Sequence, residues 1–227
     1  MENGTSEITE TVLKLRLLKK FGNGRILRVL KYSDKQKINE VIKKTDIKKF
    51  EEIVEYCNND GIRMVSYFDK GYPHKLKEIN SPPALLFLKG DMALLNTPAI
   101  TIVGTRHPSA ESFEWALNAS KAVAAKGYVV ISGGAAGIDA AAHSGALSSD
   151  GKTICVLGCG FDNLYPKENI DLLKLISRKG LLVTEYLPSH RPTKISLLER
   201  NRITSGLGEA VVIVATGING GSMWQFN

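Results

Sequence analysis

Cysteine is scarce in this sequence of 227 residues, which contains only Cys57, Cys155 and Cys159. So small and odd a number argues against a disulfide framework and for a reducing compartment. Cys155 and Cys159 are close in sequence, but no His or second Cys pair completes the pattern of a zinc site. We therefore expect buried free thiols, two of them in a strand and the loop after it, and no metal ion.

Long apolar segments are also missing. The longest apolar runs have about six residues, as at 210–215, whereas a membrane-spanning helix needs about 20. The first ten residues are acidic and polar, which is not the pattern of a secretory signal peptide. A cytoplasmic protein is expected.

Sequence patterns for nucleotide cofactors and for nucleophilic catalysis are absent as well. No segment matches the Walker A pattern or G-x-G-x-x-G, so neither an ATPase nor a dinucleotide cofactor is predicted. Ser132, Asp139 and His143 are close in sequence, but nothing indicates a nucleophile elbow. We expect no catalysis at this trio. Asp139 is interpreted as an acid that orders the loop before it and complements a helix dipole.

What the sequence does have is a positive net charge. It contains 30 Lys and Arg against 23 Asp and Glu, for a formal charge of +7. The excess is spread along the chain: residues 1–70 carry 15 basic against 11 acidic side chains (net +4), and residues 71–227 carry 15 against 12 (net +3). This charge modestly favours a polyanionic partner. A mildly basic solvated surface is the alternative.

The chain is predicted to contain two domains. Residues 7–59 show amphipathic helical patterns, with Asp34 and Asp46 as N-caps, and predict a small all-α domain over residues 1–60. From residue 61 to 227, strands alternate with helices. Strands are predicted at 63–67, 84–88, 99–103, 128–131, 153–157, 181–183 and 210–214, and helices at 110–126, 138–147, 167–177 and 196–203. Apolar strands separated by helices indicate a Rossmann-like α/β fold, with a mostly parallel sheet covered on both faces.

Ligands of such sheets bind beyond the carboxyl ends of the strands. There, Gly133, Gly134 and Gly137 precede an Ala-rich helix whose N-terminus favours a phosphate group. The alternative is that these glycines serve only tight turns and close packing. Several strands are followed by basic residues, which suits a polyphosphate backbone; they are Arg106, Lys167, Arg200 and Arg202. Residues 200–202 could equally form a solvated helix face. Bases could stack on Tyr165 or Phe161.

Four ordered motifs resemble the DNA-processing protein A (DprA/Smf) family. They are Ile102 to Arg106, Ser132 to His143, Tyr165 to Asn169 and Arg200 to Ile203, and the likeness extends over about residues 60–222. It implies a Rossmann-like core that binds single-stranded DNA, protects it during natural transformation and delivers it to the RecA recombinase, without catalysis. It also implies a homodimer.

The resemblance further implies which residues contact DNA phosphates. Carried onto this chain, they are Gly104, Arg106, Ser132, Gly133, Gly134, Gly137, Lys167, Asn169, Arg200, Asn201 and Arg202. The helical domain resembles the sterile-alpha-motif-like domain of many members. Its turn at 21–25 is also similar to a helix–hairpin–helix turn, which can offer backbone amides to a phosphate; a plain turn between helices is the alternative.

This chain departs from the family pattern in three places. Gly134 and Ala136 stand where the family more often has Leu and a basic residue, and Glu199 stands where an Arg is frequent. These changes are expected to weaken DNA binding. The sequence ends at Asn227, where the family continues with a helix, another strand and often a winged-helix domain. We expect a fragment or a shortened member, which puts dimerisation and RecA loading in doubt.

Two other functions stay open. The chain could be a Rossmann-like nucleotide sensor or a phosphoribohydrolase, with Glu185 as the best-placed acid. Gly220-Gly221-Ser222 lacks the partners that such a hydrolase loop usually has. The core could also be a partner-binding remnant that has no ligand.

Overall fold

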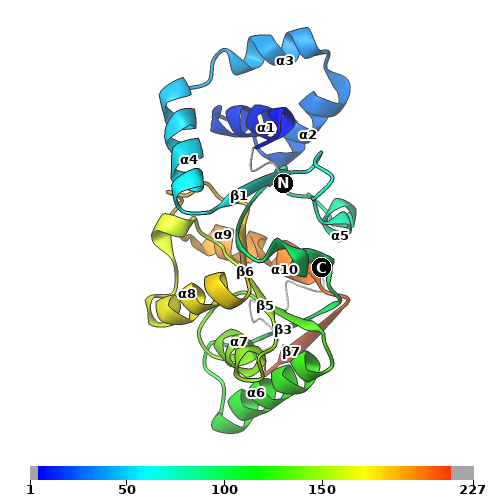
Figure 1. The fold of residues 1–227 in the computed structure, drawn as a ribbon, viewed down its shortest axis with the longest axis vertical. Helices are drawn as coiled ribbons and strands as arrows, with labels where there is room; N and C mark the ends of the chain where they lie inside the picture. Colours follow the sequence, from blue (N-terminus) through cyan, green and yellow to red (C-terminus); the bar gives the residue numbers. More distant parts are fainter. Residues whose placement is uncertain (1–4, 216–227) are drawn as a thin grey trace. The chain divides into compact units, whose positions relative to one another are not determined.

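The computed structural model describes residues 5–215 (Figure 1). The chain divides into two compact units, Met1–Leu88 and Lys89–Asn227. The predicted domain boundary at residue 60 lies earlier than this division. It stays a prediction, because the compactness of a unit does not show which part of the chain folds alone.

The first unit contains a group of helices followed by an antiparallel strand pair. α1 contacts each of the next three helices. β1 pairs with β2, and Val65 lies opposite Leu86. The elements are α1 (Glu7–Leu17), α2 (Asn23–Tyr32), α3 (Lys35–Ile42), α4 (Ile47–Asn59), β1 (Arg63–Ser66), α5 (His74–Glu78) and β2 (Leu85–Gly90), whose last two residues follow the division at Leu88.

Local sequence determines where these helices begin. The predicted N-caps are confirmed: Asp34 accepts the Lys37 N–H at 2.8 Å, and Asp46 accepts the Lys49 N–H at 3.1 Å. A carboxylate at this position satisfies a backbone donor that has no partner within the helix. Packing then depends on the apolar face of α1, where Leu13 is fully buried.

The second unit contains five parallel strands in the order β6-β5-β4-β3-β7. They are β3 (Ala99–Gly104), β4 (Val129–Ser132), β5 (Thr153–Val156), β6 (Leu181–Thr184) and β7 (Ala210–Val214). Every residue of the three strands β4, β5 and β6 is buried, as expected for a parallel sheet that has helices on both faces. The predicted Rossmann-like fold is confirmed.

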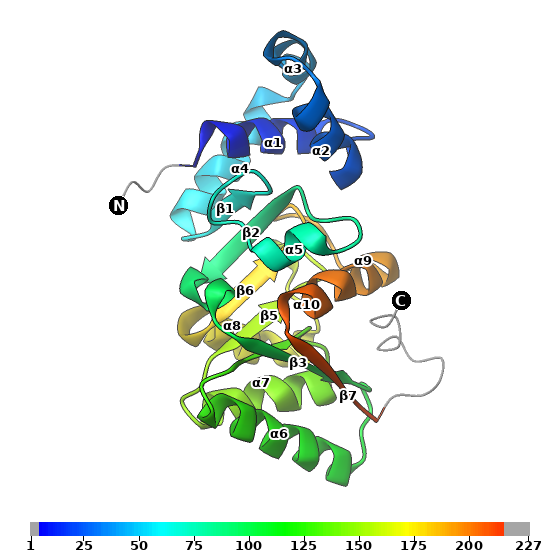
Figure 2. The same cartoon turned by 90° about the vertical axis from the view of Figure 1, so that its right-hand side faces the viewer.

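Two sets of helices cover this sheet, as Figure 2 shows. One face carries α6 (Ala110–Ala125), α7 (Ile138–Ser148) and α8 (Ile170–Lys179), and the other carries α9 (Lys194–Glu199) and α10 (Asn201–Leu207). Short 3-10 helices lie at Met92–Asn96, Phe161–Asn163 and Lys167–Asn169. No helix among residues 5–215 has both the length and the apolar character needed to cross a membrane.

Two of the predicted helices differ in detail. The segment at 196–203 contains parts of two helices, because α9 ends at Glu199 and α10 begins at Asn201, with Arg200 between them. The helix predicted from Lys167 begins as a 3-10 turn and becomes α-helical at Ile170. Both differences place a turn beside the carboxyl ends of the strands, where a ligand would bind.

Candidate functional site

The loop at 133–137, between β4 and α7, is held from inside by Asp139. One oxygen of its carboxylate accepts the N–H groups of Gly133 and Ala135, both at 3.2 Å. Burial raises the pKa of Asp139, while the positive charge of Arg200 and the two N–H groups oppose the rise. The predicted role of Asp139 in ordering the loop is confirmed. These two amides are therefore occupied within the chain.

Asn169 holds the same loop from a second side. Its Nδ2 donates to the carbonyl oxygens of Gly134 and Ala135, each at 3.0 Å. The side chain is buried, so its amide serves the loop and does not face solvent. Asn169 thereby connects the loop to the segment that begins with Lys167.

The segment after β3 contacts the loop from a third side. The Ile138 N–H donates to the Thr105 carbonyl at 3.1 Å. Gly137 adopts φ +77°, and a Cβ built there would lie 2.5 Å from the Thr105 oxygen. Glycine is needed at this position for its backbone conformation and for the close approach. The packing explanation of the loop glycines therefore holds at Gly137.

Arg200 lies beneath the loop. Its side chain is 5% exposed, and its Nη1 donates to the Val156 carbonyl at 2.6 Å. A Cβ built at Gly133 would overlap this guanidinium, so glycine is required here by the arginine. A solvated helix face is therefore wrong for Arg200. Neighbouring Asn201 is buried as well.

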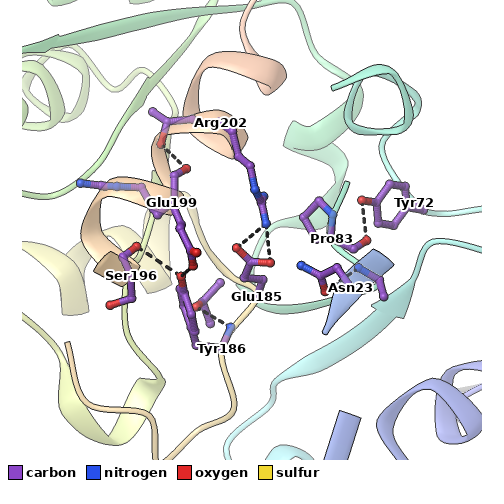
Figure 3. Close-up of polar contacts among 12 residues, drawn as sticks. Asn23, Tyr72, Pro83, Glu185, Tyr186, Ser196, Glu199 and Arg202 are labelled. Carbon is purple, nitrogen blue, oxygen red and sulfur yellow. Dashed lines mark hydrogen bonds and ion pairs between the residues drawn. The ribbon is translucent and has the colours of Figure 1, made fainter. Parts of the chain in front are cut away.

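Arg202 points to a buried carboxylate, as Figure 3 shows. Its Nη2 lies 2.6 and 2.7 Å from the two oxygens of Glu185, whose side chain is 3% exposed. Beside this pair, the Tyr186 hydroxyl donates to the carboxylate of Glu199 at 3.1 Å. Burial, followed by the negative charge of Glu185, raises the pKa of Tyr186. The Glu185 carboxylate is thus neutralised by Arg202.

Two predicted basic residues remain exposed. Arg106 and Lys167 face solvent, and neither forms an ion pair within residues 5–215. In the same stretch of the chain, the N–H groups of Ala136 and Gly137 have no hydrogen-bond partner. These amides directly precede α7, at the end of the helix where its dipole favours an anion.

The remaining predicted positions differ in exposure. Ser132 is fully buried, and a Cβ on Gly104 would overlap the Val214 carbonyl oxygen, so Gly104 serves close packing of β3 and β7. Tyr165 is 39% exposed, whereas Phe161 is 8% exposed. The prediction that bases could stack on Phe161 is wrong, because its ring is packed inside.

Ser132, Asp139 and His143 do not form the relay that catalysis would need. The Nδ1 of His143 lies 2.7 Å from the hydroxyl of Thr153, which itself donates to a backbone carbonyl, so Nδ1 carries the proton. Burial and the charge of Arg200 lower the pKa of His143 to about 3. The Nε2 of His143 would have to accept the Ser132 proton, but Nε2 and the Ser132 Oγ are both buried without a hydrogen-bond partner among the described residues, so the two groups do not contact each other.

The cysteines are buried free thiols, as predicted. Burial raises the pKa of Cys155, and it raises that of Cys159 to about 11. Both groups are therefore poor nucleophiles at neutral pH. Among residues 5–215 there is no cluster of three or more acidic, Cys or His side chains that could hold a metal ion.

Sequence reasoning missed the partners that connect this site. The Val156 carbonyl bonds to Arg200, and the Thr153 hydroxyl bonds to His143. Both belong to β5, whose sequence predicts only a buried apolar strand. The buried position of Arg200 was missed too. Its one signal is the glycine at 133, which leaves room for a side chain from elsewhere in the fold.

These features define a Rossmann-like α/β protein in which the edge formed by the carboxyl ends of the strands carries exposed basic residues and the loop at 133–137, which we call the glycine loop. A family model described as DNA recombination-mediator protein A matches residues 63–227. The chain belongs to this family.

Individual relatives agree with this assignment. Over 164 residues the chain is 40% identical to the DNA processing protein DprA of Bacillus subtilis, covering 72% of this chain and 55% of that protein. It is 40% identical over 161 residues to DprA of Streptococcus pneumoniae, covering 70% and 56%. The chain thus spans about half the length of these curated relatives.

Two solved structures are similar to this fold. The X-ray structure of DprA from Streptococcus pneumoniae matches with a TM-score of 0.82 and 31% identity, over 96% of this chain and 81% of that chain. DNA processing protein A of Helicobacter pylori, whose structure was described for its single-stranded DNA binding mode, matches with a TM-score of 0.64 and 33% identity. That match covers 72% of this chain and 74% of that chain.

Proposed function

We propose that this protein binds single-stranded DNA at the carboxyl ends of its parallel strands and acts in DNA uptake or recombination. One observation carries the proposal. Exposed Arg106 and Lys167 come from the two segments that contact the glycine loop, and this loop offers the unpartnered N–H groups of Ala136 and Gly137. Charged side chains and free amides together suit a phosphate backbone.

The buried residues of the site have a different role in this proposal. Arg200, Asn169 and Asp139 hold the loop in the conformation that presents its free amides, and they do not touch the strand. Arg202 remains paired with the buried carboxylate of Glu185, whose charge it neutralises. Tyr165 is exposed and offers a ring on which a base can stack.

Membership in the family supports the wider role. We propose that the bound strand is delivered to RecA and that the protein acts as a homodimer in the cytoplasm. The DNA-binding mode described for the Helicobacter pylori relative supports the choice of ligand. Binding without turnover fits a site in which the Nε2 of His143 does not contact the Ser132 hydroxyl.

Fluorescence anisotropy of a labelled oligo-dT tests the proposal. Affinity should fall steeply with salt. In a plot of the logarithm of the binding constant against the logarithm of the salt concentration, each phosphate contact should contribute about 0.7 to the steepness of the slope. Arg106→Ala should weaken binding about 10- to 100-fold, the value of a charge-assisted contact, and lower the slope by about 0.7. Duplex of the same length should bind more weakly.

Lys121→Ala is the matched control. Lys121 is an exposed cation in the second half of α6, away from the end of the helix that follows β3, so its loss should leave affinity nearly unchanged. If the two substitutions weaken binding equally, the binding is due to the general charge of the surface and not to a site at Arg106. A folded protein that ignores oligo-dT but releases ribose from nucleoside monophosphates would support the nucleotide-hydrolase alternative.

A further inference from the structure

Two lysines of the first unit converge on one tyrosine ring. The Nζ of Lys31, at the end of α2, lies 5.0 Å from the ring centroid of Tyr67, and the Nζ of Lys77, in α5, lies 5.1 Å from it. Such distances are those of cation–π contacts. Three segments that are separate in sequence thus bring two ammonium groups to one ring.

The ring itself is held in place. The centroid of Tyr72 lies 5.5 Å from that of Tyr67, and the hydroxyl of this buried neighbour donates to the Pro83 carbonyl at 2.8 Å (Figure 3). The N–H of Tyr67 donates to the Ala84 carbonyl, and the Ala84 N–H donates to Asn23 at the start of α2. The arrangement therefore belongs to the fold of this unit.

Neither ammonium group has an acidic partner. No ion pair involves Lys31 or Lys77 within the described part of the chain. The acids nearest to the two lysines in sequence have other partners: Asp34 lies 3.3 Å from the Lys37 ammonium group, and Glu78 lies 3.3 Å from His74. Asp69, two residues after Tyr67, accepts hydrogen bonds from Ser6, Thr9 and Ser66. The ring attracts both cations but leaves their net charge of two uncompensated.

A residue next to the pair offers a stacking surface. Tyr32 follows Lys31 at the end of α2 and is 83% exposed, the most exposed of the large apolar and aromatic side chains in the described residues. Unpaired cations beside exposed aromatic rings are the combination with which proteins bind single strands without sequence preference.

We propose that Lys31, Lys77 and Tyr67 form a second site for a phosphate group of single-stranded nucleic acid, with Tyr32 as the adjoining base-stacking side chain. All four residues belong to the first unit, whereas the glycine loop belongs to the second. This inference rests on the proposed function, since it adds contacts for the same ligand. It assigns binding to a part of the chain outside the strand ends.

The test compares two double variants by oligo-dT anisotropy over a salt series. Lys31→Gln/Lys77→Gln removes the converging pair. Lys48→Gln/Lys49→Gln removes the same charge from exposed positions of α4 in the same unit, where neither lysine makes a cation–π contact within the described residues. The first variant should lower the log–log salt slope by about 0.7 to 1.4, because it removes one or two cations that neutralise phosphates, and should lower affinity at least severalfold. The control should change both much less.

A cross-linking experiment on the unmodified protein supplies a readout besides affinity. Oligo-dT containing 5-iododeoxyuridine is irradiated with the protein, and the attached peptides are identified by mass spectrometry. Cross-links at Tyr32 or Tyr67 are expected. Cross-links confined to the second unit, together with equal behaviour of the two double variants, would overturn the second site.

The outcomes separate this inference from the proposed function. Binding that depends on Arg106 but responds equally to both double variants leaves the proposed function intact and overturns the second site. Absence of oligo-dT binding by the folded protein overturns both. Titration with inorganic phosphate separates a strand site from a free-phosphate site. Saturable phosphate binding that requires Lys31 and Lys77, without any effect of either on oligo-dT affinity, overturns the nucleic-acid assignment.

Discussion

The guanidinium of Arg200 occupies the space that a side chain at Gly133 would fill. The arginine donates to the Val156 carbonyl from this position and is almost entirely buried. Its positive charge also opposes the rise that burial causes in the pKa of Asp139, whose carboxylate holds the glycine loop. Arg200, which the sequence suggests is a surface cation, thus supports the glycine loop from beneath.

Gly133→Ala tests this relationship. The added Cβ must displace the Arg200 guanidinium from the Val156 carbonyl, and overpacking of this kind costs about 1 to 3 kcal/mol. Thermal or urea unfolding measures the loss. Gly24→Ala is the control, because a Cβ at Gly24 meets nothing within 4 Å and alanine is the better helix former. Equal stability of the two variants would mean that Arg200 is free to move away.

The proposed positioning role of Asn169 has a different signature. Asn169→Ala removes two hydrogen bonds to loop carbonyls, each worth about 0.5 to 1.5 kcal/mol. Oligo-dT affinity should therefore fall as the loop loosens. The salt slope should stay as in the unmodified protein, because every cation that neutralises a phosphate remains. A slope lowered as far as in Arg106→Ala would indicate direct contact with the strand.

His143 predicts a dependence of stability on pH. Its pKa is lowered to about 3 from 6.5 by burial and by the charge of Arg200, so between these values the unfolded chain binds a proton that the folded chain does not. The contribution is fully present above pH 6.5 and is lost as pH falls towards 3, by up to about 1.4 kcal/mol per pH unit.

Urea unfolding at about pH 7, 6, 5 and 4 measures this dependence. In His143→Asn the slope of unfolding free energy against pH should flatten, since Asn does not titrate and its amide can still donate to Thr153. His107→Asn is the control, because His107 is exposed. An unchanged slope in His143→Asn would show that other groups dominate the acid sensitivity.

The sequence predicted the strands and loops that form this site better than the directions of the side chains within it. Apolar runs such as 129–132 and 153–156 identify buried parallel strands, and the strand ends then locate the candidate loops. The direction of a side chain within those loops depends on contacts that are distant in sequence. Arg200 turns inward because α9 and α10 meet at it, and Arg202 finds Glu185 seventeen residues away.

Ala136→Lys should strengthen DNA binding. Ala136 is partly exposed, and its own N–H has no partner within the described residues. A lysine there would add one phosphate contact beside the free amides, which should raise affinity at low salt and steepen the log–log salt slope by about 0.7. Ala122→Lys places the same charge at an exposed position of α6 and is the control. If both variants bind with equal affinity, the added charge acts through the surface as a whole. That result would contradict the proposal that the glycine loop contacts the strand.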